Sequence, residues 1–195
     1  MSVVFIMFPP ASGGNHCKNL LCLDQSFYNA PDFTTSLYTD GKITAHAQPG
    51  NNFNPVLLPI ANQQDKSVII HGHFAELATY CADIRKIANK KFILIAPSDN
   101  EDFDIIFKRS KKLNYKSNLD EYYRSEQFFL YQPEMCQRYF DVDIEDICCI
   151  KLSELHNSNL KSFDIIDRLN YFLDTRIDYH QAQHCHSIWH KNNYF

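Results

Sequence analysis

Two histidines that flank a glycine, His71 and His73, follow an apolar run that ends at Ile70. If that run is a strand, alternation places both imidazoles on the same side of it. An imidazole changes its charge near neutral pH, so a histidine at a strand end beside an anion site is suited to general-base catalysis. A hydrogen-bonded structural histidine is the commoner fate of either residue alone. Because two of them occur in three residues, we predict a catalytic role for one.

A second stretch with chemical potential is FPPASGGNHCKN, residues 8–19, between an apolar run and a segment with a helical pattern. Gly13 and Gly14 permit a positive φ and the close approach of a ligand. The backbone amides at the start of the helix would then point at an anion, with the helix dipole adding attraction. The groups available to that anion belong to Ser12, Gly13, Gly14, Asn15 and His16. The simpler alternative is a turn that uses two glycines only to enter the helix.

The residues that follow these glycines bear on the kind of anion. The triphosphate-binding pattern GxxxxGK[ST] is absent, and no lysine follows Gly14 directly. The nearest is Lys18, one helical turn further along the chain. A triphosphate with magnesium is therefore the less favoured ligand.

The elements that must position these residues alternate along the chain. Apolar runs indicate buried strands at residues 3–8, 66–73, 91–97 and 146–155. Helices are expected at residues 15–27, 75–90, 103–113, 162–174 and 179–191, with mixed structure at 114–135 and irregular structure at 28–66. Strands separated by helices imply crossover connections and a mainly parallel sheet flanked by helices on both faces. We predict a single α/β domain over residues 1–195.

Three of the expected strands end in polar segments. PPASGGNH follows the first strand, HGH ends the second, and APSDN follows the third. Ligands of such sheets bind beyond the carboxyl ends of the strands. If the strands are parallel, these three segments share one rim of the sheet.

Composition narrows the class of protein. The chain has 195 residues, is 45% hydrophobic and carries a net charge of −4, which predicts one globular domain without a general attraction to nucleic acid or anionic membranes. No apolar run approaches the length of a membrane span, and residues 3–8 are too short for a signal peptide. The seven cysteines form no CxxC pair, which favours reduced thiols. We expect a soluble, cytoplasmic protein.

The order of these motifs resembles the P-loop sulfotransferase superfamily. Its members hold the 5′-phosphosulfate of 3′-phosphoadenosine 5′-phosphosulfate (PAPS) in a modified phosphate loop, typically Pro-Lys-Ser-Gly-Thr-Thr. In this sequence Ser12 and Gly13 match the Ser-Gly of that loop, and Gly14 and Asn15 fall on the two threonines. The resemblance implies a P-loop-type three-layer sandwich that binds PAPS as a co-substrate.

The segment around the paired histidines carries the catalytic part of the resemblance. IIHGH falls on the family's Ile-Ile-Lys-Thr-His pattern, which places His73 on the catalytic base and His71 on the lysine. The tail, with QAQHCHSIWHKNNY, resembles the closing helices of many members. The resemblance implies metal-free, in-line transfer of a sulfuryl group to a hydroxyl or amine of a small-molecule, carbohydrate or other acceptor. The irregular residues 28–66 are expected to cover the acceptor.

The sequence departs from the family pattern at both phosphate positions. Ala11 stands where the loop lysine is expected, so His16 and Lys18 are the candidate replacements. The family's 3′-phosphate site uses an arginine at a strand end and a serine two helical turns later, but Ile105 stands at that serine position. The available replacements are Ser98, Lys108, Arg109, Ser110, Lys111 and Lys112. A solvated basic helix face is an equally good interpretation of the last five.

Four histidines crowd the tail, at positions 180, 184, 186 and 190. Pairs spaced i,i+4 can bind zinc, but no HExxH pattern is present and the two pairs point in different directions. We expect no metal site here and interpret Trp189 as a packing residue that docks the last helix.

Two other classes of function remain open. A P-loop kinase or nucleotide-binding protein would use a phosphate donor in place of PAPS, but it would need a loop lysine followed by serine or threonine, and that pair is absent. A non-catalytic binding module derived from the sulfotransferase fold is favoured by the missing lysine and disfavoured by the His-Gly-His segment.

Overall fold

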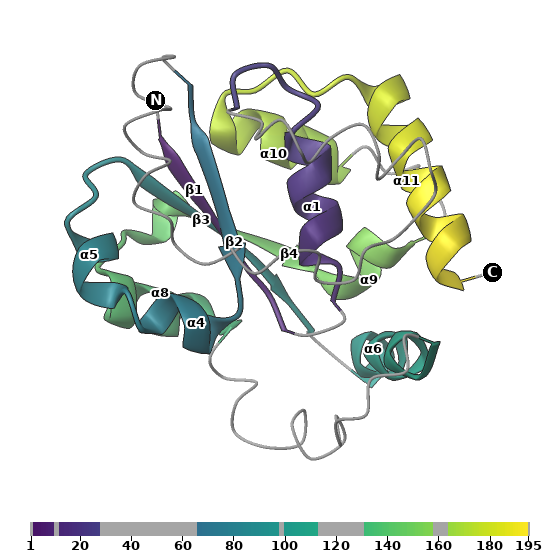
Figure 1. Cartoon of the computed structure of the whole chain (residues 1–195), viewed down its shortest axis with the longest axis horizontal. Helices are drawn as coiled ribbons and strands as arrows, with labels where there is room; N and C mark the ends of the chain where they lie inside the picture. Colours follow the sequence, from purple (N-terminus) through teal and green to yellow (C-terminus); the bar gives the residue numbers. More distant parts are fainter. Residues whose placement is uncertain are drawn as a thin grey trace.

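Four parallel strands form a sheet in the order β2-β1-β3-β4 (Figure 1). The computed structural model describes residues 2–9, 12–27, 66–97, 100–112, 131–157 and 164–194. The strands are β1 (Val3–Met7), β2 (Val68–Gly72), β3 (Lys90–Ala96) and β4 (Ile147–Lys151). β1 pairs in parallel with β2 on one side and with β3 on the other, and β3 pairs in parallel with β4. The predicted α/β fold with a parallel sheet is confirmed.

Strand β1 shows why an unbroken apolar run was needed. Its side chains alternate between two hydrophobic clusters, with Val4 and Ile6 in one and Val3, Phe5 and Met7 in the other. All five are buried, as expected for a central strand whose two faces are both covered by helices.

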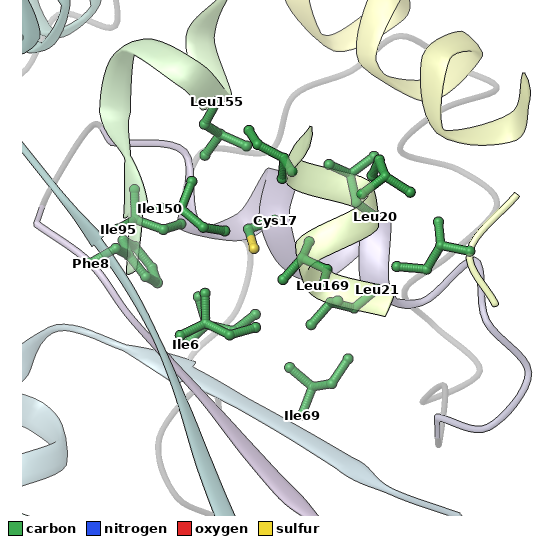
Figure 2. Close-up of a cluster of buried hydrophobic side chains, with 14 of the residues drawn as sticks. Ile6, Phe8, Cys17, Leu20, Leu21, Ile69, Ile95, Ile150, Leu155 and Leu169 are labelled. Atoms are coloured by element: carbon green, nitrogen blue, oxygen red, sulfur yellow. The ribbon is translucent and has the colours of Figure 1, made fainter. Parts of the chain in front are cut away.

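Five of the described helices lie on one side of the sheet (Figure 1). They are α1 (Gly14–Leu21), α6 (Asn100–Lys112), α9 (Leu152–His156), α10 (Asp164–Leu173) and α11 (Tyr179–Tyr194), with α11 packed outside α1. In Figure 2, Leu20 and Leu21 of α1 gather with Leu169 of α10 above Ile6 and Ile69 of the sheet. These contacts fix the position of α1, and with it the loop that precedes α1.

Three of the described helices cover the opposite face and complete the three layers (Figure 1). They are α4 (Phe74–Ala78), α5 (Cys81–Arg85) and α8 (Pro133–Phe140), and a short 3-10 helix, Ile144–Asp146, precedes β4. Phe92 of β3 points into this side of the core. Its ring stacks on Phe5 and on Phe140, with ring centroids 4.9 Å and 5.1 Å apart, respectively. None of the described helices is long and apolar enough to cross a membrane.

Several boundaries differ from those expected from the sequence. The helix expected at 75–90 is two short helices, and the Thr79 hydroxyl donates to the carbonyl oxygen of Glu76 (2.6 Å) where the first one ends. β4 ends at Lys151, and α9 begins at Leu152 because the Glu154 carboxylate accepts the Lys151 amide (3.0 Å). α1 ends at Leu21, six residues before the expected end. Residues 28–65 and 113–130 lie outside the described part of the chain.

Candidate functional site

The loop between β1 and α1 has the backbone that the two glycines predict. β1 ends at Met7, α1 begins at Gly14, and Gly13 between them has a left-handed conformation with φ 96°. The first amides of a helix have no acceptor within the helix, and the N-cap residue of α1, Gly13, has no side chain to cap them. The expected strand end, helix start and positive φ are confirmed.

The same loop is covered on the side of α9 and α11. Ser12 is buried; its hydroxyl donates to the carbonyl oxygen of Pro9 (2.7 Å), and its own carbonyl oxygen accepts the Nε2–H of His156 (2.6 Å). A Cβ on Gly13 would lie 3.1 Å from His156 Nε2 and 3.4 Å from Trp189 Cζ2. Ser12 therefore serves the hydrogen bonding of the loop itself, and an anion would have to approach α1 beside His156 and Trp189.

Four buried rings lie against this loop, and we call them the histidine cluster: His16, His156, His186 and Trp189. His16 stacks on Trp189 with ring centroids 4.0 Å apart and an interplanar angle of 3°. His186 Nε2 lies 2.7 Å from the carbonyl oxygen of Asn157, which can only accept, so this nitrogen carries the proton. In neutral His186 the other nitrogen, Nδ1, then accepts the Nε2–H of His16 at 3.0 Å.

Electrostatics keep these imidazoles neutral. Burial, followed by repulsion from any proton on His186, holds the pKa of His16 well below its ordinary value. Burial and then Arg109 do the same for the pKa of His156. His16 is thus a neutral packing and hydrogen-bonding residue here rather than a cation that replaces the missing loop lysine. Lys18, the other candidate, is half-buried on α1, and burial lowers its pKa.

Arg109 of the basic segment faces the histidine cluster. Its side chain is 7% exposed, its Nε donates to Asn193 Oδ1 (3.1 Å), and its guanidinium carbon lies 5.2 Å from the centre of the Trp189 ring. Lys108 beside it is exposed. Arg109 therefore lies on the side of the sheet that carries the β1–α1 loop, while it also joins α6 to α11. Ser98 and the side chains of residues 110–112 lie outside the described part of the chain.

His73 lies at the neighbouring strand end, directly after β2. Its Nδ1–H donates to the carbonyl oxygen of Phe8 (2.8 Å), and its ring meets the Phe8 ring edge-on with centroids 5.1 Å apart. The Phe8 ring in turn packs against Gly14, where a Cβ would overlap it. Donation from Nδ1 leaves the acceptor lone pair on Nε2, the nitrogen that a general base uses. His73 is partly exposed, as a base that meets a substrate must be.

His71 has a different environment from His73. It lies within β2, opposite Ile6 of β1, is 2% exposed, and is nearly parallel to the Phe8 ring at 6.0 Å. Because β2 ends at Gly72, strand alternation does not extend to His73, which instead begins α4. Both imidazoles nevertheless pack on Phe8. A buried His71 is better placed to support Phe8 than to contact a ligand.

The structure gathers most of the predicted residues at one junction, which comprises Ser12, Gly13, Gly14, Asn15, His16 and His73. Sequence reasoning did not single out His156, although it follows the fourth strand and so belongs to the same rim of the sheet. The expectation that Trp189 docks the last helix is confirmed by its stacking on His16. The role of His186 as an acceptor for His16 carried no local signal in the sequence.

Comparisons with known proteins add no assignment to this geometry. No family model, curated protein or solved structure matches this chain. In the part of the chain that the structure describes, no three His, Cys, Asp or Glu side chains are grouped to hold a metal ion. The sheet shows the fold class, and function has to be inferred from the residues at its rim.

Proposed function

We propose that this chain is a sulfotransferase-like enzyme that binds PAPS at the β1–α1 junction and transfers its sulfuryl group to a hydroxyl or amine acceptor. One observation carries the proposal. Phe8 links the two halves of the site, because its ring packs against Gly14 at the start of α1 while its carbonyl oxygen holds the imidazole of His73. Amides that attract phosphate and an imidazole that can accept a proton thus lie at neighbouring strand ends.

Each group has a defined task in the transfer. His73 Nε2 takes the proton of the acceptor as the acceptor oxygen or nitrogen attacks the donor sulfur. The bond from sulfur to the bridging phosphate oxygen breaks, and the amides at the start of α1 stabilise the charge on the departing 5′-phosphate. The carbonyl oxygen of Phe8 orients the ring through Nδ1 and stabilises the imidazolium that forms.

The residues fit the donor better at its 5′ end than at its 3′-phosphate. At the 5′ end the left-handed Gly13 opens a helix whose first amides can bind phosphate oxygens. For the 3′-phosphate, Arg109 is a buried cation on the side of the sheet that carries α1, and its Nε donates to Asn193.

Replacing Arg109 with methionine is expected to weaken the binding of 3′-phosphoadenosine 5′-phosphate by about tenfold or more, since a hydrogen bond to a charged group contributes roughly 1.5–3 kcal/mol. Methionine keeps an apolar stem beside Trp189. The measurement is calorimetric titration at two salt concentrations, because wild-type affinity should fall with salt more than that of the variant. Lys108→Met, on an exposed neighbour, is the control. Equal affinities for wild type and Arg109→Met would restrict Arg109 to docking α11.

A non-catalytic binding module is the second candidate, and the cover over the loop favours it. The Ser12 hydroxyl is engaged by Pro9, and His156 and Trp189 pack on Gly13. This arrangement would suit a fold that has kept the loop for packing alone.

Calorimetric titration with 3′-phosphoadenosine 5′-phosphate, compared with ATP plus magnesium, separates these functions. We expect the bisphosphate to bind more tightly, because the loop lacks the lysine and hydroxyl pair that magnesium triphosphates need. Tighter binding of ATP with magnesium would indicate a kinase-like protein. Binding of neither ligand would contradict the proposal and favour the non-catalytic module.

A further inference from the structure

The hydrogen bond between His186 of α11 and His16 of α1 depends on the protonation of both rings. His186 Nε2–H donates to the carbonyl oxygen of Asn157, so Nδ1 of the same ring must keep its lone pair to accept from His16. When both rings are protonated, two N–H groups face each other across 3.0 Å. Protonation of His16 and His186 together therefore breaks this hydrogen bond between the two helices.

The other contacts of the histidine cluster hold the cover over the β1–α1 loop. His156 Nε2–H donates to the carbonyl oxygen of Ser12 at 2.6 Å, which joins α9 to the loop. Trp189 stacks on His16 and meets His156 edge-on, with centroids 5.0 Å apart. Release of α11 would remove Trp189 from Gly13 and uncover the loop.

The titratable groups that face these imidazoles are basic. Those facing His16 come from α6, α9 and α11, and are Arg109, His156, His186 and His190. His156 faces three of the same groups, Arg109, His186 and His190. Asp102 of α6 is buried and accepts the Ser153 amide (2.6 Å) near the start of α9, the end opposite His156. A proton added to the cluster would therefore be buried beside the positive Arg109 and beside any imidazole that is already protonated, which is costly.

We propose that the histidine cluster is a proton-sensitive latch, in which protonation of His16, His156 and His186 releases α11 and uncovers the β1–α1 loop. The latch does not depend on the transfer activity proposed above. It would make access to the start of α1 a function of pH.

The direction of the pH dependence follows from the docked state. Burial is the largest cause that lowers the pKa of each of the three imidazoles below the ordinary 6.5. Released imidazoles titrate near that ordinary value, so the released state binds more protons as the pH falls below about 6.5. The docking of α11 on α1 therefore has its full stability above this pH and becomes less stable below it. Each imidazole that gains a proton favours release by up to about tenfold per pH unit.

Trp189 allows the latch to be tested directly, because it is the only tryptophan in the chain. On lowering the pH from about 7.5 to about 5, its emission maximum should move to longer wavelength as the ring enters water. Hydrogen exchange, corrected for the intrinsic effect of pH, should rise in α11 and in the first turn of α1. Amides of β1 and β3 should stay protected over the same range, because the sheet does not open.

Glutamine variants identify the titrating groups. His16→Gln and His156→Gln each keep an N–H that can donate to the same acceptor, but neither side chain takes up a proton. The double variant should move the midpoint of the Trp189 fluorescence transition to lower pH. The number of protons taken up in the transition should fall from up to three to one. His184→Gln, on an exposed histidine of the same helix, is the matched control and should leave the transition unchanged. Each single variant should give an intermediate shift if the pair does not fold.

Three results would overturn the latch. The first is wild-type protein in which the emission maximum and α11 exchange do not change over this range. The second is loss of protection in α11 that coincides with loss in β1 and β3, which would be global unfolding. The third is a folded glutamine variant, single or double, with an unchanged midpoint.

Discussion

Replacing His73 with alanine is expected to lower the rate of sulfuryl transfer by about two to four orders of magnitude, the usual contribution of a positioned general base. Binding of 3′-phosphoadenosine 5′-phosphate should stay largely unchanged, since the His73 ring contacts the carbonyl oxygen and the ring of Phe8. The measurement is kcat/KM with PAPS and a panel of hydroxyl and amine acceptors, together with calorimetry.

The control for His73 must separate proton transfer from positioning. His73→Asn keeps a side-chain N–H near the place of Nδ1, so the hydrogen bond to the carbonyl oxygen of Phe8 can persist while the basic nitrogen is lost. We expect the asparagine variant to be as slow as the alanine variant. Substantial activity of His73→Asn would make His73 a positioning residue, and normal activity of His73→Ala would exclude the mechanism.

Local patterns predicted the fold because each strand carries its own signal. β1, β2 and β3 are apolar runs long enough to be buried on both faces, and the helical segments between them require parallel pairing. The positive φ of Gly13 agrees with the sequence, since glycine adopts a left-handed conformation without the steric cost that other residues have. Helix ends were predicted less well, because Thr79 and Glu154 act through side chains that compete with or cap the backbone.

The histidine cluster could not be predicted from the sequence because its contacts are distant in the chain. His16 and His186 are 170 residues apart, and Ser12 and His156 are 144 residues apart. No local periodicity shows which two imidazoles form a hydrogen bond, so the histidines of residues 180–190 could be interpreted only as i,i+4 pairs along one helix. The partner of His186 is His16 because α11 docks on α1. Burial of the Ser12 hydroxyl was hidden for the same reason, since it depends on packing by α9 and α11.

Gly14→Ala is expected to destabilise the fold by about 1–3 kcal/mol, the range for overpacking of a filled interior. Helix propensity predicts the opposite sign, because alanine is favoured over glycine in a helix by up to about 1 kcal/mol. The clash should win, since a Cβ at Gly14 would overlap Cγ, Cδ1 and Cε1 of Phe8. Phe8 is 5% exposed and packs on both His71 and His73, so its ring cannot move alone. Urea unfolding of the variant, with the midpoint compared at constant slope, measures the loss.

Gly72→Ala provides the matched control, because it adds the same methyl group at another buried glycine. There the nearest atom to the new Cβ is the carboxylate oxygen Glu76 Oε2 at 2.9 Å, which also accepts the His73 amide (3.0 Å). Glu76 is exposed, so its carboxylate can give way more easily than the buried Phe8 ring, and the loss should be smaller. Phe8→Leu in the Gly14→Ala background should recover part of the stability, which a double-mutant cycle would show as coupling between the two positions. If Gly14→Ala unfolds at the wild-type urea concentration, Phe8 does not pack against α1. In that case the contact that places His73 beside the start of α1 would be lost as well, and the catalytic proposal with it.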